Sequence, residues 1–265
     1  MSSIERRIAL DDGAATTIES WGRSGPVLLG IHGMTSSRKS WERLANFFDG
    51  RFRMVAYDQR GHGDSAGITG PMSLERGVRD LENVVAALGE PVDALVGHSW
   101  GGAIAIAGGR RLPVQRVVAI DPMVRQVADA WYGEFLEELR ELFALTGDAR
   151  DARTRHDYAE WSPSDVEAKV HAVHSMTVEP IEGLMRENPP IAWDLRSDIA
   201  GFEKPLLLAL AAPGEGINEA STLEEISRNR SSSVDIVTFP GAGHNLHRTH
   251  FESFARTLAE FLSRT

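Results

Sequence analysis

The segment that decides the fold is Gly97-His98-Ser99-Trp100-Gly101, which follows the apolar run 92–96 and leads into the small residues Gly102 and Ala103. Glycine two positions before and after a serine is typical of a sharp turn from a strand into a helix, on which the serine side chain stands exposed on a strained backbone. The N–H groups after Ser99 would lie at a helix N-terminus, which favours negative charge. The segment therefore predicts that Ser99 is a nucleophile.

Short runs that are apolar on both faces flank this turn along the chain. Such runs predict strands buried from both sides, and hence a mostly parallel sheet with helices outside. The predicted strands are 15–21, 27–31, 53–57, 94–96, 116–120, 206–211 and 235–239, and the predicted helices are 38–48, 74–88, 101–111, 131–145, 165–176 and 251–262. Helix 74–88 has apolar residues about 3.6 positions apart, Ser73 as N-cap and Gly89 as a stop.

The sequence pattern changes after Pro122, because residues 123–202 contain only helical patterns and are richer in charge and tryptophan. We therefore expect an α/β core made of residues 1–122 and 203–265, interrupted by a helical cap at 123–202. Three tryptophans of this segment are candidates either for an aromatic pocket wall or for the interior of the cap: Trp131, Trp161 and Trp193.

A serine hydroxyl is a weak nucleophile and needs a base. Of nine histidines, His244 is the best candidate, because it follows strand 235–239 in the glycine-rich loop Pro240-Gly241-Ala242-Gly243. His247 and His250 follow at three-residue spacing, but no carboxylate cluster accompanies them, so we expect exposed or cap-facing side chains and no metal site. In the cap segment, we expect His171 and His174 to lie on the surface or along a pocket.

The base needs a carboxylate that orients its ring, in the chain order serine, acid, histidine. Asp121 directly follows strand 116–120, and Glu215 lies farther along a loop after strand 206–211. Asp121 is preferred, because an acidic residue at a strand end among apolar residues needs a partner; Glu215 remains the alternative. Asp58 would break the chain order, and it and Arg60 are expected to form structural ion pairs.

Acyl transfer also requires N–H donors aimed at the oxygen that becomes negative. His32-Gly33-Met34 ends strand 27–31, and Trp100 follows the serine. The backbone N–H groups of Met34 and Trp100 are therefore the candidate oxyanion hole.

Composition narrows the remaining possibilities. The 265 residues are 42% hydrophobic and 25% charged, which is ordinary for a globular protein, and the absence of cysteine excludes disulfides, thiolate metal sites and a cysteine nucleophile. A net charge of −10 without a basic block argues against nucleic acid and anionic membranes as partners. No secretory signal is visible and no apolar run approaches the roughly 20 residues that span a bilayer, so we expect a soluble, cytoplasmic protein.

Together these motifs resemble the α/β-hydrolase superfamily, in its capped, epoxide-hydrolase-like and esterase-like branch. The resemblance rests on His32-Gly33, on Asp58-Gln59-Arg60-Gly61-His62-Gly63-Asp64-Ser65, on Gly97-His98-Ser99-Trp100-Gly101-Gly102 and on Gly241-Ala242-Gly243-His244. It implies an eight-stranded, mostly parallel sheet with a helical cap after strand six. Dehalogenases and epoxide hydrolases of this branch carry aspartate where this chain has Ser99, so those chemistries are not expected.

The resemblance also bears on the acid. The family's usual aspartate follows strand seven, where this chain has Ala212-Pro213-Gly214-Glu215 and no aspartate. Some members place the acid after strand six, at the position of Asp121.

We therefore expect a serine hydrolase that cleaves a small-molecule carboxylic ester, or a lactone, through Ser99, His244 and Asp121, without cofactor or metal. Hydrolysis of a carbon–carbon bond in a diketone-like ring-cleavage product is the alternative, and thioester cleavage, amide cleavage and perhydrolysis use the same residues. A non-catalytic small-molecule receptor on the same fold is the alternative of another class.

Overall fold

The computed structural model describes residues 2–68, 70–125, 130–174, 176–189 and 192–264. It contains one eight-stranded sheet in the order β1-β2-β4-β3-β5-β6-β7-β8. β1 and β2 pair antiparallel, as do β2 and β4, and all other neighbours are parallel. The strands are β1 (Ser3–Ala9), β2 (Ala15–Trp21), β3 (Val27–Ile31), β4 (Arg53–Tyr57), β5 (Val92–His98), β6 (Arg116–Ile120), β7 (Leu206–Ala211) and β8 (Val234–Phe239). The expected mostly parallel sheet is thus confirmed.

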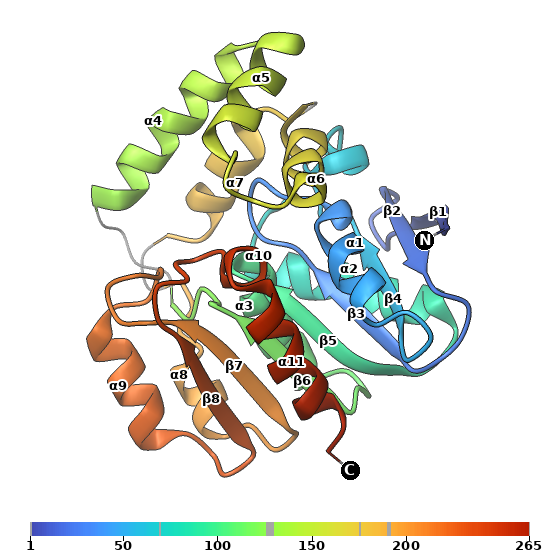
Figure 1. Cartoon of the computed structure of the whole chain (residues 1–265), viewed down its shortest axis with the longest axis vertical. Helices are drawn as coiled ribbons and strands as arrows, with labels where there is room; N and C mark the ends of the chain where they lie inside the picture. The colour runs from blue at the N-terminus through green and yellow to red at the C-terminus, as the bar shows by residue number, and fades with distance from the viewer. Residues whose placement is uncertain (1, 69, 126–129, 175, 190–191, 265) are drawn as a thin grey trace.

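Helices cover both faces of this sheet (Figure 1). Neighbouring residues of a strand point to opposite faces: Leu29 packs with α2 (Leu74–Leu88) and α3 (Trp100–Gly109), whereas Leu28 packs with α1 (Glu42–Phe47) and α11 (Phe251–Leu262). The remaining helices are α4 (Ala130–Ala144), α5 (Asp148–Asp157), α6 (Pro163–His174), α7 (Glu179–Glu187), α8 (Arg196–Ala200), α9 (Ala220–Asn229) and α10 (Leu246–Thr249), with short 3-10 turns η1 (Arg38–Trp41) and η2 (Gly63–Ser65).

The local signals around α2 act as the sequence predicts. The Ser73 side chain accepts a hydrogen bond from the Arg76 N–H (3.2 Å), and Gly89 ends the helix with a left-handed φ of 69°. The predicted helix 38–48 is instead the 3-10 turn η1 followed by α1. Its first turn is held to the core, because the Arg38 N–H donates to the Asp58 carboxylate (2.8 Å).

Helices α4 to α7 follow β6 in the chain and lie together at one end of the molecule, above the sheet (Figure 1). α6 packs against η1 and α1, whereas α8 packs against α3 and α9. Cavities and side chains between this helical insert and the sheet therefore combine residues from distant parts of the chain. Within the described ranges, no helix has the length and apolar character needed to traverse a bilayer.

Candidate active site

Ser99 lies at the turn between β5 and α3 with φ 55° and ψ −119°, a strained backbone for a residue other than glycine. Its N–H donates to the Ile120 carbonyl on the neighbouring strand (2.9 Å). The two flanking glycines are required by space: a Cβ at Gly101 would lie 2.1 Å from the Ile31 oxygen, and one at Gly97 would lie 2.2 Å from the Gly101 oxygen. Close approach of strand and helix therefore fixes the serine in place.

His244 lies in the loop after β8, and its Nδ1 is 2.7 Å from Oδ2 of Asp121, which follows β6. Asp121 is 1% exposed and has φ 36°. Its carboxylate also accepts the N–H groups of Ile217 (3.2 Å) and Ala211 (3.4 Å). A buried carboxylate held this way keeps the His244 proton on Nδ1 and leaves Nε2 free to accept another proton.

Glu215, the alternative acid, has a different environment. It is exposed, and its Oε2 accepts the Gly241 N–H at 2.7 Å. No contact recorded for the described residues joins Glu215 to His244. Glu215 thus holds the loop that precedes His244 and does not touch its ring.

His98 contacts the backbone and the ring of His244. The His98 Nε2 donates to the His244 carbonyl (3.0 Å), and the two rings lie in tilted contact with their centroids 4.6 Å apart. His247 packs on His98 in a tilted arrangement, with 4.3 Å between the ring centroids, and is buried, so the expectation of an exposed or cap-facing side chain is wrong for His247. Burial lowers the pKa of both His98 and His247 well below the ordinary value, and the neutral rings pack as aromatic groups.

The backbone of the candidate oxyanion hole lies next to the serine. A Cβ at Gly33 would lie 3.0 Å from the Ser99 Cβ, so the chain carrying Met34 passes against Ser99. Trp100 is the first residue of α3, where N–H groups have no partner within the helix. His32 is buried and holds the Gly33 turn: its Nδ1 donates to the Gly33 carbonyl (2.8 Å), and its Nε2 accepts from the Gln59 N–H (3.0 Å).

Ser99 and His244 line a cavity of about 560 Å³ between the sheet and the helical insert. Of the three candidate tryptophans, Trp161 lines it, Trp193 packs against Trp100 (6.0 Å between ring centroids), and the Trp131 side chain lies outside the described part of the structure. Further lining residues that the sequence did not single out are Phe135, Tyr158, Arg125, Lys169 and Arg248. Of these, only Arg248 carries a signal in the sequence, because it lies four residues after His244.

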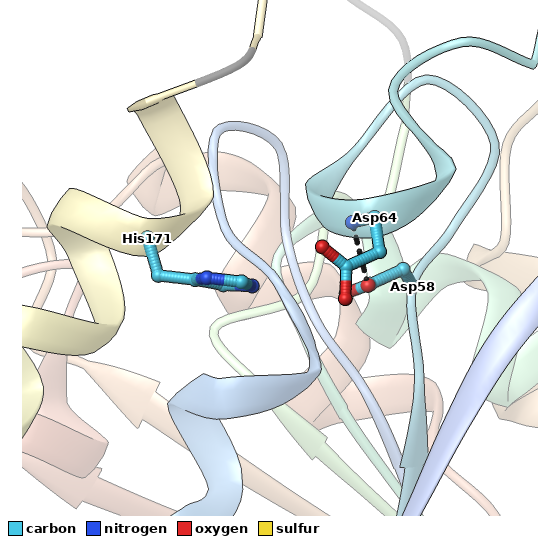
Figure 2. Close-up of side chains that lie close together, drawn as sticks. All are labelled: Asp58, Asp64 and His171. Atoms are coloured by element: carbon cyan, nitrogen blue, oxygen red, sulfur yellow. Dashed lines mark hydrogen bonds between the residues drawn. The ribbon is translucent and has the colours of Figure 1, made fainter. Parts of the chain in front are cut away.

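A second group of titratable side chains, Asp58, Asp64 and His171, lies where α6 meets the core (Figure 2). Both carboxylates pair with the buried Arg38, and Asp58 also accepts the Asp64 N–H (2.9 Å). The Arg38 guanidinium already supplies these carboxylates with the positive charge that a metal ion would bring, so the group is explained as a buried ion-pair network. The prediction that Asp58 and Arg60 form structural ion pairs is confirmed, since Arg60 pairs with Asp80 (3.0 Å).

Comparisons with known proteins agree with this architecture. The model of the alpha/beta hydrolase family matches residues 27–258. The 2-(acetamidomethylene)succinate hydrolase of Mesorhizobium japonicum (strain LMG 29417 / CECT 9101 / MAFF 303099) is 26% identical over 90% of this chain and 88% of its own length. The N-formylmaleamate deformylase of Pseudomonas putida (strain KT2440) is 26% identical over 91% of this chain and 90% of its own length.

Among solved structures, that of an E-2-(acetamidomethylene)succinate hydrolase superposes with a TM-score of 0.81, at 23% identity, over 99% of this chain and all of that one. The family match spans most of the sheet, Ser99, Asp121 and His244. The chain therefore belongs to the alpha/beta hydrolase family.

Proposed function

We propose that this protein is a serine hydrolase that cleaves a carboxylic ester or lactone through Ser99, His244 and Asp121. The observation that carries the proposal is the 2.7 Å contact between His244 and the buried Asp121 at a cavity that Ser99 also lines. A strained serine and an imidazole at one cavity, with a buried carboxylate bound to that imidazole, are the three groups that nucleophilic acyl transfer needs.

In the proposed mechanism, the Ser99 Oγ attacks the carbonyl carbon while its proton passes to the His244 Nε2. His244 keeps its other proton on Nδ1, hydrogen-bonded to the ionised Asp121 carboxylate, which stabilises the imidazolium that forms. The Met34 and Trp100 N–H groups receive the negative oxygen of the tetrahedral intermediate. The bond from carbon to the leaving oxygen then breaks, and His244 returns its proton to that oxygen.

The second half of the reaction repeats these roles with water. His244 takes a proton from a water molecule as its oxygen attacks the acyl-enzyme, and the carbon–Oγ bond breaks. The proton then returns to the Ser99 oxygen, and a carboxylic acid leaves. These steps consume one water and use no oxidant or cofactor.

Cleavage of an acyl group from nitrogen is the second candidate. Two relatives that match about nine tenths of this chain are named for acetamido and N-formyl substrates, in which the acyl carbon is bonded to nitrogen. The same residues would then protonate an amine instead of an alcohol. Paired ester and amide substrates with a common acyl group distinguish the two candidates.

A fluorophosphonate probe tests the proposal directly. We expect its mass on the peptide that contains Ser99, no labelling of Ser99→Ala, and hydrolysis of short p-nitrophenyl esters by the wild type only. Folded wild-type protein with an unlabelled Ser99 would contradict the proposal. Tight ligand binding without turnover would instead indicate a receptor.

A further inference from the structure

Two buried cations line the cavity that contains Ser99. Lys169 comes from α6 of the helical insert and is 6% exposed, and Arg248 comes from α10 of the core and is 4% exposed. Neither forms a salt bridge with any carboxylate of the described residues. Buried lysines and arginines are ordinarily paired, because an uncompensated charge costs much free energy away from water.

Neutral groups hold these cations in place. The Lys169 ammonium donates to the carbonyl (2.8 Å) and hydroxyl (2.7 Å) of Thr35, and Arg248 donates through Nη2 to the Ser36 hydroxyl (3.1 Å). Thr35 and Ser36 directly follow Met34, so both cationic groups contact the loop of the proposed oxyanion hole. The Arg248 Nη1 is buried and has no hydrogen-bond partner within the described structure.

Surrounding charges do not neutralise the pair. The carboxylate of Asp165 attracts Arg248 electrostatically, but it forms its salt bridge with Arg43 (2.9 Å). The two acidic lining residues, Glu215 and Glu219, are exposed to solvent. Aromatic faces provide partial compensation, since the Arg248 guanidinium lies 4.4 Å from the Trp161 ring centroid and the Lys169 ammonium 5.1 Å from that of Tyr158.

The charges around the two groups favour the binding of an anion. Burial, together with the charge of Arg248, lowers the pKa of Lys169 to about 7. An anion placed between the two groups would restore that pKa and satisfy the free Nη1. Arginine offers a planar pair of N–H groups that matches a carboxylate, and lysine adds a point charge.

We propose that Arg248 and Lys169 form a carboxylate-binding subsite, so that the substrate carries a free carboxylate a few bonds from the acyl carbon that Ser99 attacks. This inference rests on the proposed hydrolase function and specifies its substrate class. The subsite orients the substrate, because a carboxylate held beside the oxyanion loop limits where the scissile carbonyl can lie.

Matched substrates test the subsite. The monophenyl esters of glutaric and adipic acid carry a free carboxylate, and the corresponding diesters with a methyl cap differ only in that charge. We expect wild-type kcat/KM to favour the charged member of a pair by about 10- to 100-fold, the range that a hydrogen bond to a charged group contributes. Arg248→Gln and Lys169→Met should each lower that ratio at least tenfold.

Arg228→Gln is the matched control, because it removes the same charge from an exposed position on α9 outside the cavity lining. Its ratio should equal that of the wild type. Inhibition of the wild type tests the subsite without any substitution: glutarate should compete with the neutral diester, whereas glutaramide of the same shape should not.

The outcomes separate the two proposals. Failure of Ser99 to react with a fluorophosphonate would overturn the hydrolase function itself. A reactive enzyme that hydrolyses both members of a pair equally, and that glutarate does not inhibit, would overturn the carboxylate subsite alone. An unchanged ratio in the folded Arg248→Gln and Lys169→Met variants would do the same.

Discussion

Replacement of Asp121 by asparagine removes the negative charge beside His244 while keeping the side-chain shape. One Asp121 oxygen, Oδ2, accepts from both His244 Nδ1 (2.7 Å) and the Ile217 N–H (3.2 Å), and the other accepts from the Ala211 N–H (3.4 Å). An amide NH2 directed at Ala211 keeps the His244 tautomer but leaves its cation without a counter-charge. An amide NH2 directed at His244 forces the proton onto Nε2, which then cannot accept the Ser99 proton.

The magnitude follows from the charge that is lost. Unit charges about 4 Å apart interact by about 4 kcal/mol at an effective dielectric constant near 20, a fair value for a carboxylate that is 1% exposed beside a partly exposed imidazole. Since about 1.4 kcal/mol is a factor of ten in rate, kcat should fall about a thousandfold. The wrong tautomer would extend the loss to about ten-thousandfold.

Glu215→Gln is the paired variant. Glu215 is exposed and contacts the Gly241 N–H, a bond that a glutamine oxygen also accepts, so kcat should fall less than about threefold. Both variants are assayed for p-nitrophenyl ester hydrolysis at pH 7.5, with circular dichroism as the check on folding. A folded Asp121→Asn protein with more than a tenth of the wild-type kcat, or a larger loss in Glu215→Gln, would refute the assignment.

Two further outcomes concern the backbone and the buried lysine. Gly101→Ala places a Cβ 2.1 Å from a backbone oxygen of β3 and should lower the free energy of unfolding by more than about 3 kcal/mol in urea titrations. The control Gly133→Ala, on α4 with open space around the new Cβ, should raise the free energy of unfolding by about 0.5–1 kcal/mol. Equal effects of the two substitutions would contradict the packing argument. Lys169→Met should raise the melting temperature at pH 6.5, because it removes an unpaired buried charge. Between about pH 7, the pKa of Lys169 in the folded protein, and its ordinary pKa of 10.5, the folded wild type binds fewer protons than the unfolded chain. The stability of the wild type should therefore rise with pH across this range, and its difference in melting temperature from Lys169→Met should shrink. A difference in melting temperature that stays constant with pH would refute the buried charge.

The sequence by itself determined the central strands and the nucleophile turn. These features are local: continuous apolar runs predict β3 and β7, and Gly97 and Gly101 around Ser99 predict a strand-to-helix turn because only glycine fits the close approach. β1 escaped prediction, since it is an exposed edge strand with three consecutive charged residues and its position depends on pairing with β2.

Only the tertiary structure decided which side chains meet around the cavity. Asp121 and Glu215 both follow strands that end near the His244 loop, and the sequence favoured Asp121 but left Glu215 as an alternative. The registers of β6, β7 and β8 bring Asp121 to 2.7 Å from His244 and leave Glu215 on the surface. Lys169 and Arg248 converge on adjacent residues of one loop only because α6 packs on the core. Distances between groups so far apart in the chain are set by packing, which no local pattern of residues encodes.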